Sequence, residues 1–172
     1  MDRYTLVTDR LRLTPISFAD GDRLALFHAD ARVMSHLKHG VLSRPQSDAM
    51  VADYEAEWAA LGFGSWTVTE RAQDRFVGLG GLRVHDGPFG VLLRAAFTPE
   101  AQGKGYGPEF GRAALAFAFD VVGLSKIAAL TRPENIPGQR GLEKFGMSRE
   151  RNWTQEDGRE LILYVAHNPN GA

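Results

Sequence analysis

The stretch that decides the fold is Thr98-Pro-Glu-Ala-Gln-Gly-Lys-Gly-Tyr-Gly107, which follows an apolar run at 91–97 and leads into a segment with helical spacing. Gly103, Gly105 and Gly107 stand at alternate positions between the expected strand and helix. Glycine has no Cβ, so a bulky polar ligand can approach the main chain there. The first turn of a helix also leaves N–H groups without partners. The stretch therefore predicts an anion site, with pyrophosphate as the expected occupant, and a glycine-rich turn without ligand as the alternative.

The spacing of this stretch separates three kinds of phosphate loop. A Walker loop needs Ser or Thr after its lysine, but Lys104 is followed by Gly105. The dinucleotide fingerprint needs a third glycine where this chain has Pro108. The pattern that does match is Gln-x-x-Gly-x-Gly, formed by Gln102, Gly105 and Gly107. It resembles the acyl-CoA loop of the GNAT N-acetyltransferases.

The resemblance extends along nearly the whole chain in the order of that family. The segment 131–147 is similar to its second signature, in which an Asn opens a helix that ends in Glu-Lys-hydrophobic-Gly-hydrophobic. The segments 9–15, 62–68 and 76–82 resemble the first three strands of the RimJ/RimL-type branch, the ribosomal-protein N-acetyltransferases. The resemblance implies an α/β fold with a mixed (α+β) sheet that splits between its fourth and fifth strands, with the cofactor in the gap. We expect about seven strands and about four helices in a single N-acetyltransferase domain over residues 1–172, with its core at about 8–167.

Periodicity in the sequence supports this order of elements. Helices are expected after a cap at Ser17 or Asp20, at about 46–60 and 105–121, and after Asn135. Strands are expected around the turns at 70–74 and 85–90, and a final hairpin surrounds Asp157-Gly158. The two apolar stripes predicted to face the core comprise Val51, Tyr54, Trp58 and Leu61, and Phe110, Ala113, Ala114, Phe117 and Val121.

Composition excludes several classes of function. The chain has 172 residues, a net charge of −1 and no cysteine, so it offers no disulfide, cysteine nucleophile or thiolate metal site. The small net charge gives no reason to expect nucleic acid or a membrane as a partner. No N-terminal apolar run suggests a secretory signal, so we expect a cytoplasmic enzyme. No metal site is expected, and we expect the chain to be a monomer or a homodimer.

The resemblance implies acetyl transfer from acetyl-CoA to a primary amine, on a protein N-terminus or a small molecule, by direct transfer. Backbone N–H groups at the end of the strand before the loop would stabilise the oxyanion and pair with pantetheine. The glycine loop would hold the pyrophosphate, and Asn135 would combine an N-cap with a contact to the pantetheine arm. Lys104 and Arg140 face the phosphates or simply solvent. The residues expected to bind the cofactor are Phe97, Thr98, Gln102, Gly103, Lys104, Gly105, Tyr106, Gly107, Asn135 and Arg140.

The catalytic residues are not identified by the sequence. Gly138 stands where close relatives usually have Ser, so no general acid is assigned, and Gly138→Ser is expected to leave activity unchanged or raise it. Candidates for proton transfer are His85, His39 and Tyr164, and further candidates are His36, Glu70 and Tyr106. Trp66 and His39 are candidates for binding the acceptor. The alternative function is a non-catalytic acyl-CoA-binding module with the same fold.

Overall fold

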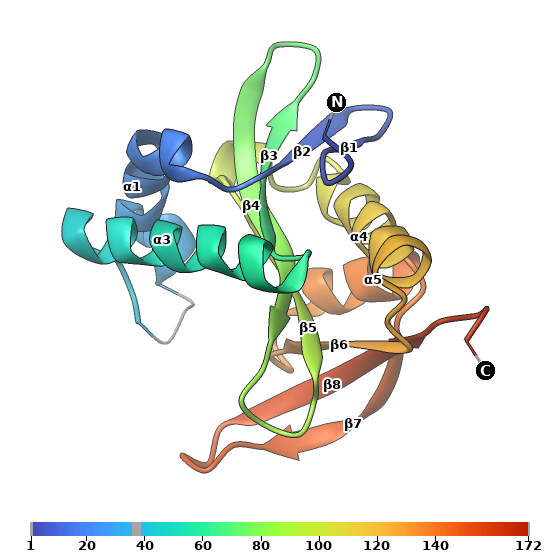
Figure 1. Ribbon diagram of the computed structural model, residues 1–172. Helices are drawn as coiled ribbons and strands as arrows, with labels where there is room; N and C mark the ends of the chain where they lie inside the picture. Colours follow the sequence, from blue (N-terminus) through green and yellow to red (C-terminus); the bar gives the residue numbers. More distant parts are fainter. Residues whose placement is uncertain (1, 36–38, 172) are drawn as a thin grey trace. The chain divides into compact units, whose positions relative to one another are not determined.

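The computed structural model describes residues 2–35 and 39–171, and Figure 1 shows the arrangement of its elements. Within the described residues, eight strands form one mixed sheet in the hydrogen-bonded order β1-β2-β3-β4-β5-β6-β8-β7. This confirms the predicted α/β fold class, and the structure adds one short strand and one short helix to the expected number. The strands are β1 (Leu6–Val7), β2 (Leu11–Pro15), β3 (Ser65–Glu70), β4 (Arg75–Val84), β5 (Val91–Phe97), β6 (Lys126–Thr131), β7 (Ser148–Thr154) and β8 (Glu160–His167).

The chain forms two compact units, one from Met1–Gly81 and Ala95–Tyr106, the other from Leu82–Arg94 and Gly107–Ala172. β4 and β5 each contribute residues to both units. The single domain expected from the sequence stays a prediction. The helices are α1 (Gly21–Ala29), α2 (Ala31–Met34), α3 (Arg44–Leu61), α4 (Tyr106–Ala116) and α5 (Ile136–Lys144).

In the first unit, α1 and α3 lie side by side (Figure 1) and pack apolar side chains against the sheet. The N-terminus of α3 is fixed by a capping box between Ser43 and Gln46, and Gly62 ends the helix with a left-handed φ of 71°. Three members of the predicted stripe, Val51, Tyr54 and Trp58, are buried. The fourth, Leu61, is 44% exposed, because it is the last residue of the helix.

The segment 9–15, which resembles the family's first strand, contains β2, the second strand of the sheet. Leu11 and Leu13 are fully buried, whereas their neighbours on β2 are not, which is the alternation expected of a strand with one covered face. β2 pairs antiparallel with both β1 and β3, and β3 pairs antiparallel with β4. These pairings bring Glu70, the last residue of β3, opposite Leu11 and close to the start of the chain.

In the second unit, β8 pairs antiparallel with both β6 and β7. β5 joins β6 in parallel through the register pair Leu92–Ala128. The core of this unit contains Phe89, Leu92, Ala128, Leu163 and Val165. β7 is the last strand of the sheet, and its pairing with β8 shifts register between residues 149 and 151. Most of its side chains are exposed, three charged ones in succession among them: Arg149, Glu150 and Arg151.

The segment 117–122 departs from the predicted helix. α4 keeps ordinary helical geometry only to Ala116, and a π-helical segment, Phe117–Val122, follows it before Gly123 ends the run with a φ of 80°. Hydrogen bonds in a π-helix join residues five apart, so side chains advance by a different angle along the segment. As a result Val121, predicted to face the core, is 56% exposed, whereas Ala118 is buried.

Candidate functional site

Two hydrogen bonds fix the start of the glycine loop. The Gln102 side-chain Nε2 donates to the Phe97 carbonyl oxygen at 3.2 Å, and the Ala101 amide donates to the Thr98 carbonyl at 2.9 Å. Both bonds turn the chain immediately after β5. The glutamine of the Gln-x-x-Gly-x-Gly pattern therefore acts here as a brace for the loop.

The tip of the loop presents unpaired donors. Gly103 and Gly105 have φ values of 76° and 80°, in the left-handed region that disfavours any residue with a Cβ. Around Gly103, an added Cβ would meet no atom within 4 Å. The amides of Gly103, Lys104 and Gly105 donate no hydrogen bond to any other described residue. Three consecutive N–H groups thus remain for an external acceptor, immediately before α4 begins at Tyr106.

The structure corrects one expectation about the strand that precedes the loop. The Thr98 amide donates to the Val77 carbonyl at 2.9 Å. Because that N–H is already used, Thr98 is not available as an oxyanion donor. A donor role for the Phe97 amide, and contacts of both residues with pantetheine, stay predictions.

The side chain of Tyr106 is hydrogen-bonded to Glu70. The Tyr106 side chain is buried, at 4% exposed, and its hydroxyl donates to Glu70 Oε1 at 2.5 Å. This hydrogen bond is the main cause that raises the pKa of Tyr106 and lowers the pKa of Glu70. The bond keeps Glu70 ionised and holds the phenol proton, so neither group is a free acid or base for catalysis.

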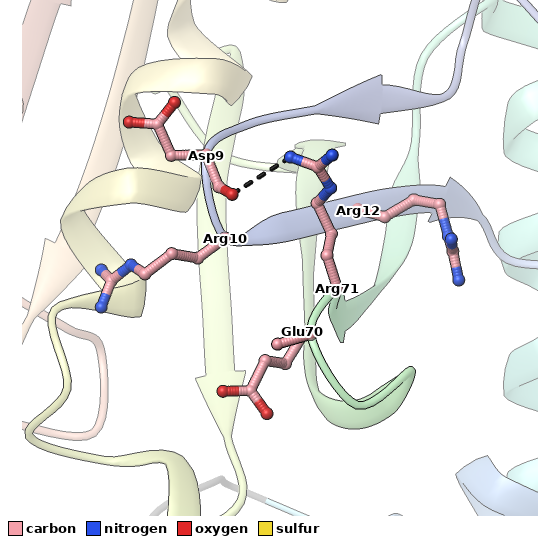
Figure 2. A pocket seen from close by; sticks show the side chains of 6 residues that line it. Asp9, Arg10, Arg12, Glu70 and Arg71 are labelled. Atoms are coloured by element: carbon pink, nitrogen blue, oxygen red, sulfur yellow. Dashed lines mark hydrogen bonds between the residues drawn. The ribbon is translucent and has the colours of Figure 1, made fainter.

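A cavity of about 610 Å³ lies beside this network (Figure 2). Two of its charged side chains, Arg10 and Glu70, also bond to residues 104 and 106. The other two arginines do not reach the loop, because Arg12 pairs with Asp74 and Arg71 donates to the carbonyls of residues 8 and 9. Figure 2 shows Arg12 pointing away from Arg10. The lining residues are Asp9, Arg10, Arg12, Glu70, Arg71 and Ala72.

No signal in the sequence identified Arg10 as part of the site. Its Nη1 donates to the Lys104 carbonyl at 2.8 Å across 94 positions of sequence. This contact depends on the pairing of β2 with β3, which periodicity does not specify. Glu70 and Tyr106 are candidates from the sequence, but the hydrogen bond between them is not predicted by it.

In the second unit, Asn135 caps α5 as predicted. Its Oδ1 accepts from the Gly138 amide at 3.0 Å, and its Nδ2 donates to Thr131 Oγ1 at 3.3 Å. Arg140 lies on the exposed face of the same helix. Contacts of Asn135 and Arg140 with a cofactor stay predictions, as does that of Gly107, which opens the second unit.

Two of the histidine candidates, His85 and His39, lie within the described residues. His85 is half-buried in the turn after β4, where its Nδ1 accepts from the Gly87 amide at 2.9 Å. That bond places the ring proton on Nε2. His39 is exposed, and His36 lies outside the described residues. Their roles in proton transfer or acceptor binding stay predictions.

Tyr164 and Trp66 both lie in the interior. Tyr164 is 1% exposed and donates to Glu143 Oε1 at 3.1 Å; burial is the main cause that raises its pKa, so the phenol is protonated at neutral pH. Trp66 is 0% exposed, and its Nε1 donates to the Tyr4 carbonyl at 2.8 Å. An indole in that position packs the core, which does not support the predicted contact with an acceptor.

Within residues 2–35 and 39–171, no group of three or more His, Asp or Glu side chains is arranged to hold a metal ion. None of the helices in the same residues is both long and apolar enough to cross a membrane.

Comparison with known proteins bears on the family. Residues 10–148 match the family described as "Acetyltransferase (GNAT) domain". The uncharacterized N-acetyltransferase YnaD of Bacillus subtilis is 29% identical over 145 residues, which cover 84% of this chain and 83% of YnaD.

Two solved structures share the fold at low identity. The ribosomal-protein-S5-alanine acetyltransferase of Vibrio fischeri superimposes with a TM-score of 0.81 at 15% identity, over 98% of both chains. The spermidine N-acetyltransferase of Vibrio cholerae, solved in complex with CoA and spermine, gives 0.77 at 20% identity, over 94% of this chain and 97% of that one. Since the family match spans most of the sequence and the glycine loop lies within it, the chain belongs to the GNAT acetyltransferase family.

Proposed function

We propose that this protein is an N-acetyltransferase that moves the acetyl group of acetyl-CoA directly to a primary amine. The observation that carries the proposal is the run of three amides at residues 103–105, which have no acceptor among the described residues. They point to an oxygen-rich anion, and the two left-handed glycines leave room for it. The diphosphate of coenzyme A fits this set of donors.

The proposed reaction depends on contributions from the co-substrate, the protein and the acceptor amine. Acetyl-CoA supplies an acyl group already activated as a thioester. Lys104 adds positive charge to the loop that would hold the diphosphate, and a role of the Phe97 amide toward the oxyanion stays a prediction. The chain has no cysteine, so an acyl-enzyme on a thiolate is excluded, which favours direct transfer. An α-amine has a pKa of about 7.7–8.0 and is partly neutral at physiological pH, so it needs little help from a base.

The acceptor is proposed only as a primary amine. Two proteins with this fold carry different acceptors in their names, a ribosomal protein's alanine in one case and spermidine in the other. The RimJ/RimL-type branch indicated by the strand motifs favours a protein N-terminus, and a small-molecule amine is the second class to test.

Calorimetric titration with acetyl-CoA, followed by a panel of amines scored by thiol release, tests the proposal. The panel contains N-terminal peptides, polyamines and amino acids. We expect binding, and thiol release with at least one class of amine. Binding without release for every amine would instead support the acyl-CoA-binding module, and absence of binding would reject both readings.

Gly105→Val tests the placement of the diphosphate. The substitution puts a branched side chain at a φ of 80° and beside Arg10 Nη2, 3.4 Å from the new Cβ. We expect acetyl-CoA binding to fall at least about 100-fold, since both strain and bulk act on the donors. Gly158→Val is the matched control, because Gly158 has a similar φ of 84° in the last hairpin. The control should lose comparable stability but keep its affinity, and equal affinity in both variants would refute the placement.

A further inference from the structure

The contacts that hold the glycine loop come from residues distant in sequence. Glu70 accepts through both oxygens, Oε1 from the Tyr106 hydroxyl at 2.5 Å and Oε2 from Arg75 Nη2 at 3.0 Å. Its side chain is only 17% exposed. Since Tyr106 is the first residue of α4, this bond fixes the point where the loop becomes a helix.

Arg10 also contacts the junction between the glycine loop and α4. Its Nη1 donates to the Lys104 carbonyl at 2.8 Å, and its guanidinium carbon lies 4.8 Å from the centre of the Tyr106 ring. That distance is within the range of a cation–π contact. The Arg10 carbonyl accepts from the Arg71 amide at 2.8 Å, which anchors the residue at the start of β2. In Figure 2, Arg10 and Glu70 extend on the same side of β2.

The loop itself has little to keep it in one conformation. Residues 103–105 donate no backbone hydrogen bond within the described chain, and two of them are glycines with a left-handed φ. Glycine loses more conformational freedom than any other residue when it is ordered. A ligand that had to order the loop would bind more weakly than one that met a loop already in place.

We propose that Arg10, Glu70 and Tyr106 form a positioning cluster that fixes the glycine loop in its binding conformation and so sets the affinity for acetyl-CoA. This inference rests on the proposed function of the loop. Tyr106 is almost fully buried and its hydroxyl is committed to Glu70, so the cluster acts through the loop backbone and not by touching the reacting atoms.

Tyr106→Phe is the primary test, because it removes one hydroxyl and leaves the ring under Arg10. We expect the Kd and the KM for acetyl-CoA to rise about tenfold while kcat at saturating acetyl-CoA stays within about twofold, as suits a lost hydrogen bond to a charged group. Tyr4→Phe is the matched control, since its hydroxyl accepts from Arg3 and lies outside the cluster. The control should keep wild-type affinity.

Substitutions of Glu70 test the same hydrogen bond from its acceptor side. Glu70→Gln retains an oxygen that can accept from Tyr106 and should bind acetyl-CoA nearly as well as wild type. Glu70→Ala should match Tyr106→Phe, and the double variant Glu70→Ala/Tyr106→Phe should bind no more weakly than either single variant, because both remove the same bond.

Three results would overturn the positioning cluster. They are an unchanged Kd in Tyr106→Phe, a fall in kcat at constant KM, and additive losses in the double variant. If wild-type protein binds acetyl-CoA and one of these results appears, only the cluster fails. If wild-type protein does not bind acetyl-CoA at all, the proposed function itself fails.

Discussion

Gly138 occupies a position where a hydroxyl side chain and a helix cap compete for the same space. A Cβ built on Gly138 would come within 2.7 Å of Asn135 Cγ, closer than van der Waals contact allows. The Asn135 side chain lies there because its Oδ1 accepts from the Gly138 amide. A side chain at position 138 is therefore incompatible with the present position of the Asn135 side chain.

Gly138→Ser, expected from the sequence to leave activity unchanged or raise it, should also have a consequence for stability. We now expect the substitution to displace Asn135 and lower the free energy of unfolding by about 1 kcal/mol, the usual cost of a lost N-cap. Gly141→Ser is the control, since a Cβ there meets nothing within 4 Å in the same helix. Urea denaturation of both variants would measure the difference, and a Gly138→Ser variant as stable as Gly141→Ser would contradict this reading of the cap.

Among the elements, α1 and α3 share a buried polar contact. His28 Nδ1 lies 2.8 Å from Ser47 Oγ, and both residues are almost fully buried, at 2% and 0% exposed. Burial lowers the pKa of His28 below its ordinary value near 6.5. Just below pH 6.5, His28 therefore binds a proton less readily in the folded protein than in the unfolded chain.

The sign of the resulting pH dependence follows from that difference. As pH falls below about 6.5, the unfolded chain gains a proton at His28 and the free energy of unfolding decreases, by at most about 1.4 kcal/mol per pH unit. Above that pH this residue adds no slope. His28→Asn should flatten the decline between about pH 5 and 6.5, whereas His167→Asn, on the exposed end of β8, should leave it unchanged. Thermal melts across this range would measure the slopes, and equal slopes in all three proteins would rule out His28.

The elements also show which features a sequence can predict. β2, β3 and the last hairpin follow from alternation and turn residues, and the start of α5 follows from Asn135, because these signals act over a few positions. The π-helical segment after Ala116 has no such signal, so the exposure of Val121 was not predicted. Likewise, the hydrogen bond from Arg10 to the Lys104 carbonyl joins residues 94 positions apart, and short-range patterns do not encode such a contact.

At the scale of the whole molecule, the chain passes three times between its two compact units, after residues 81, 94 and 106. Neither unit is a continuous segment, so neither can be cut out without breaking strands β4 or β5 or the start of α4. The single domain predicted from the sequence stays a prediction that an unfolding experiment can test.

We therefore expect one cooperative thermal transition, shifted upward by the co-substrate. At an acetyl-CoA concentration about 100 times its Kd, binding should add about 2.7 kcal/mol and raise Tm by about 5–10 °C. Differential scanning calorimetry checks both parts, since a single transition has equal calorimetric and van't Hoff enthalpies. Two resolved peaks would contradict the single domain, and a Tm indifferent to acetyl-CoA would contradict the binding site.

The edge strand β7 affects the tendency of the protein to associate in concentrated solution. A strand from another molecule that paired with β7 would lie next to the charged residues Arg149, Glu150 and Arg151. It would also pair with a strand whose register shifts between residues 149 and 151. Charge and irregularity of this kind make a poor template for fibril growth. This edge of the sheet is therefore a poor site for the addition of a strand from another molecule.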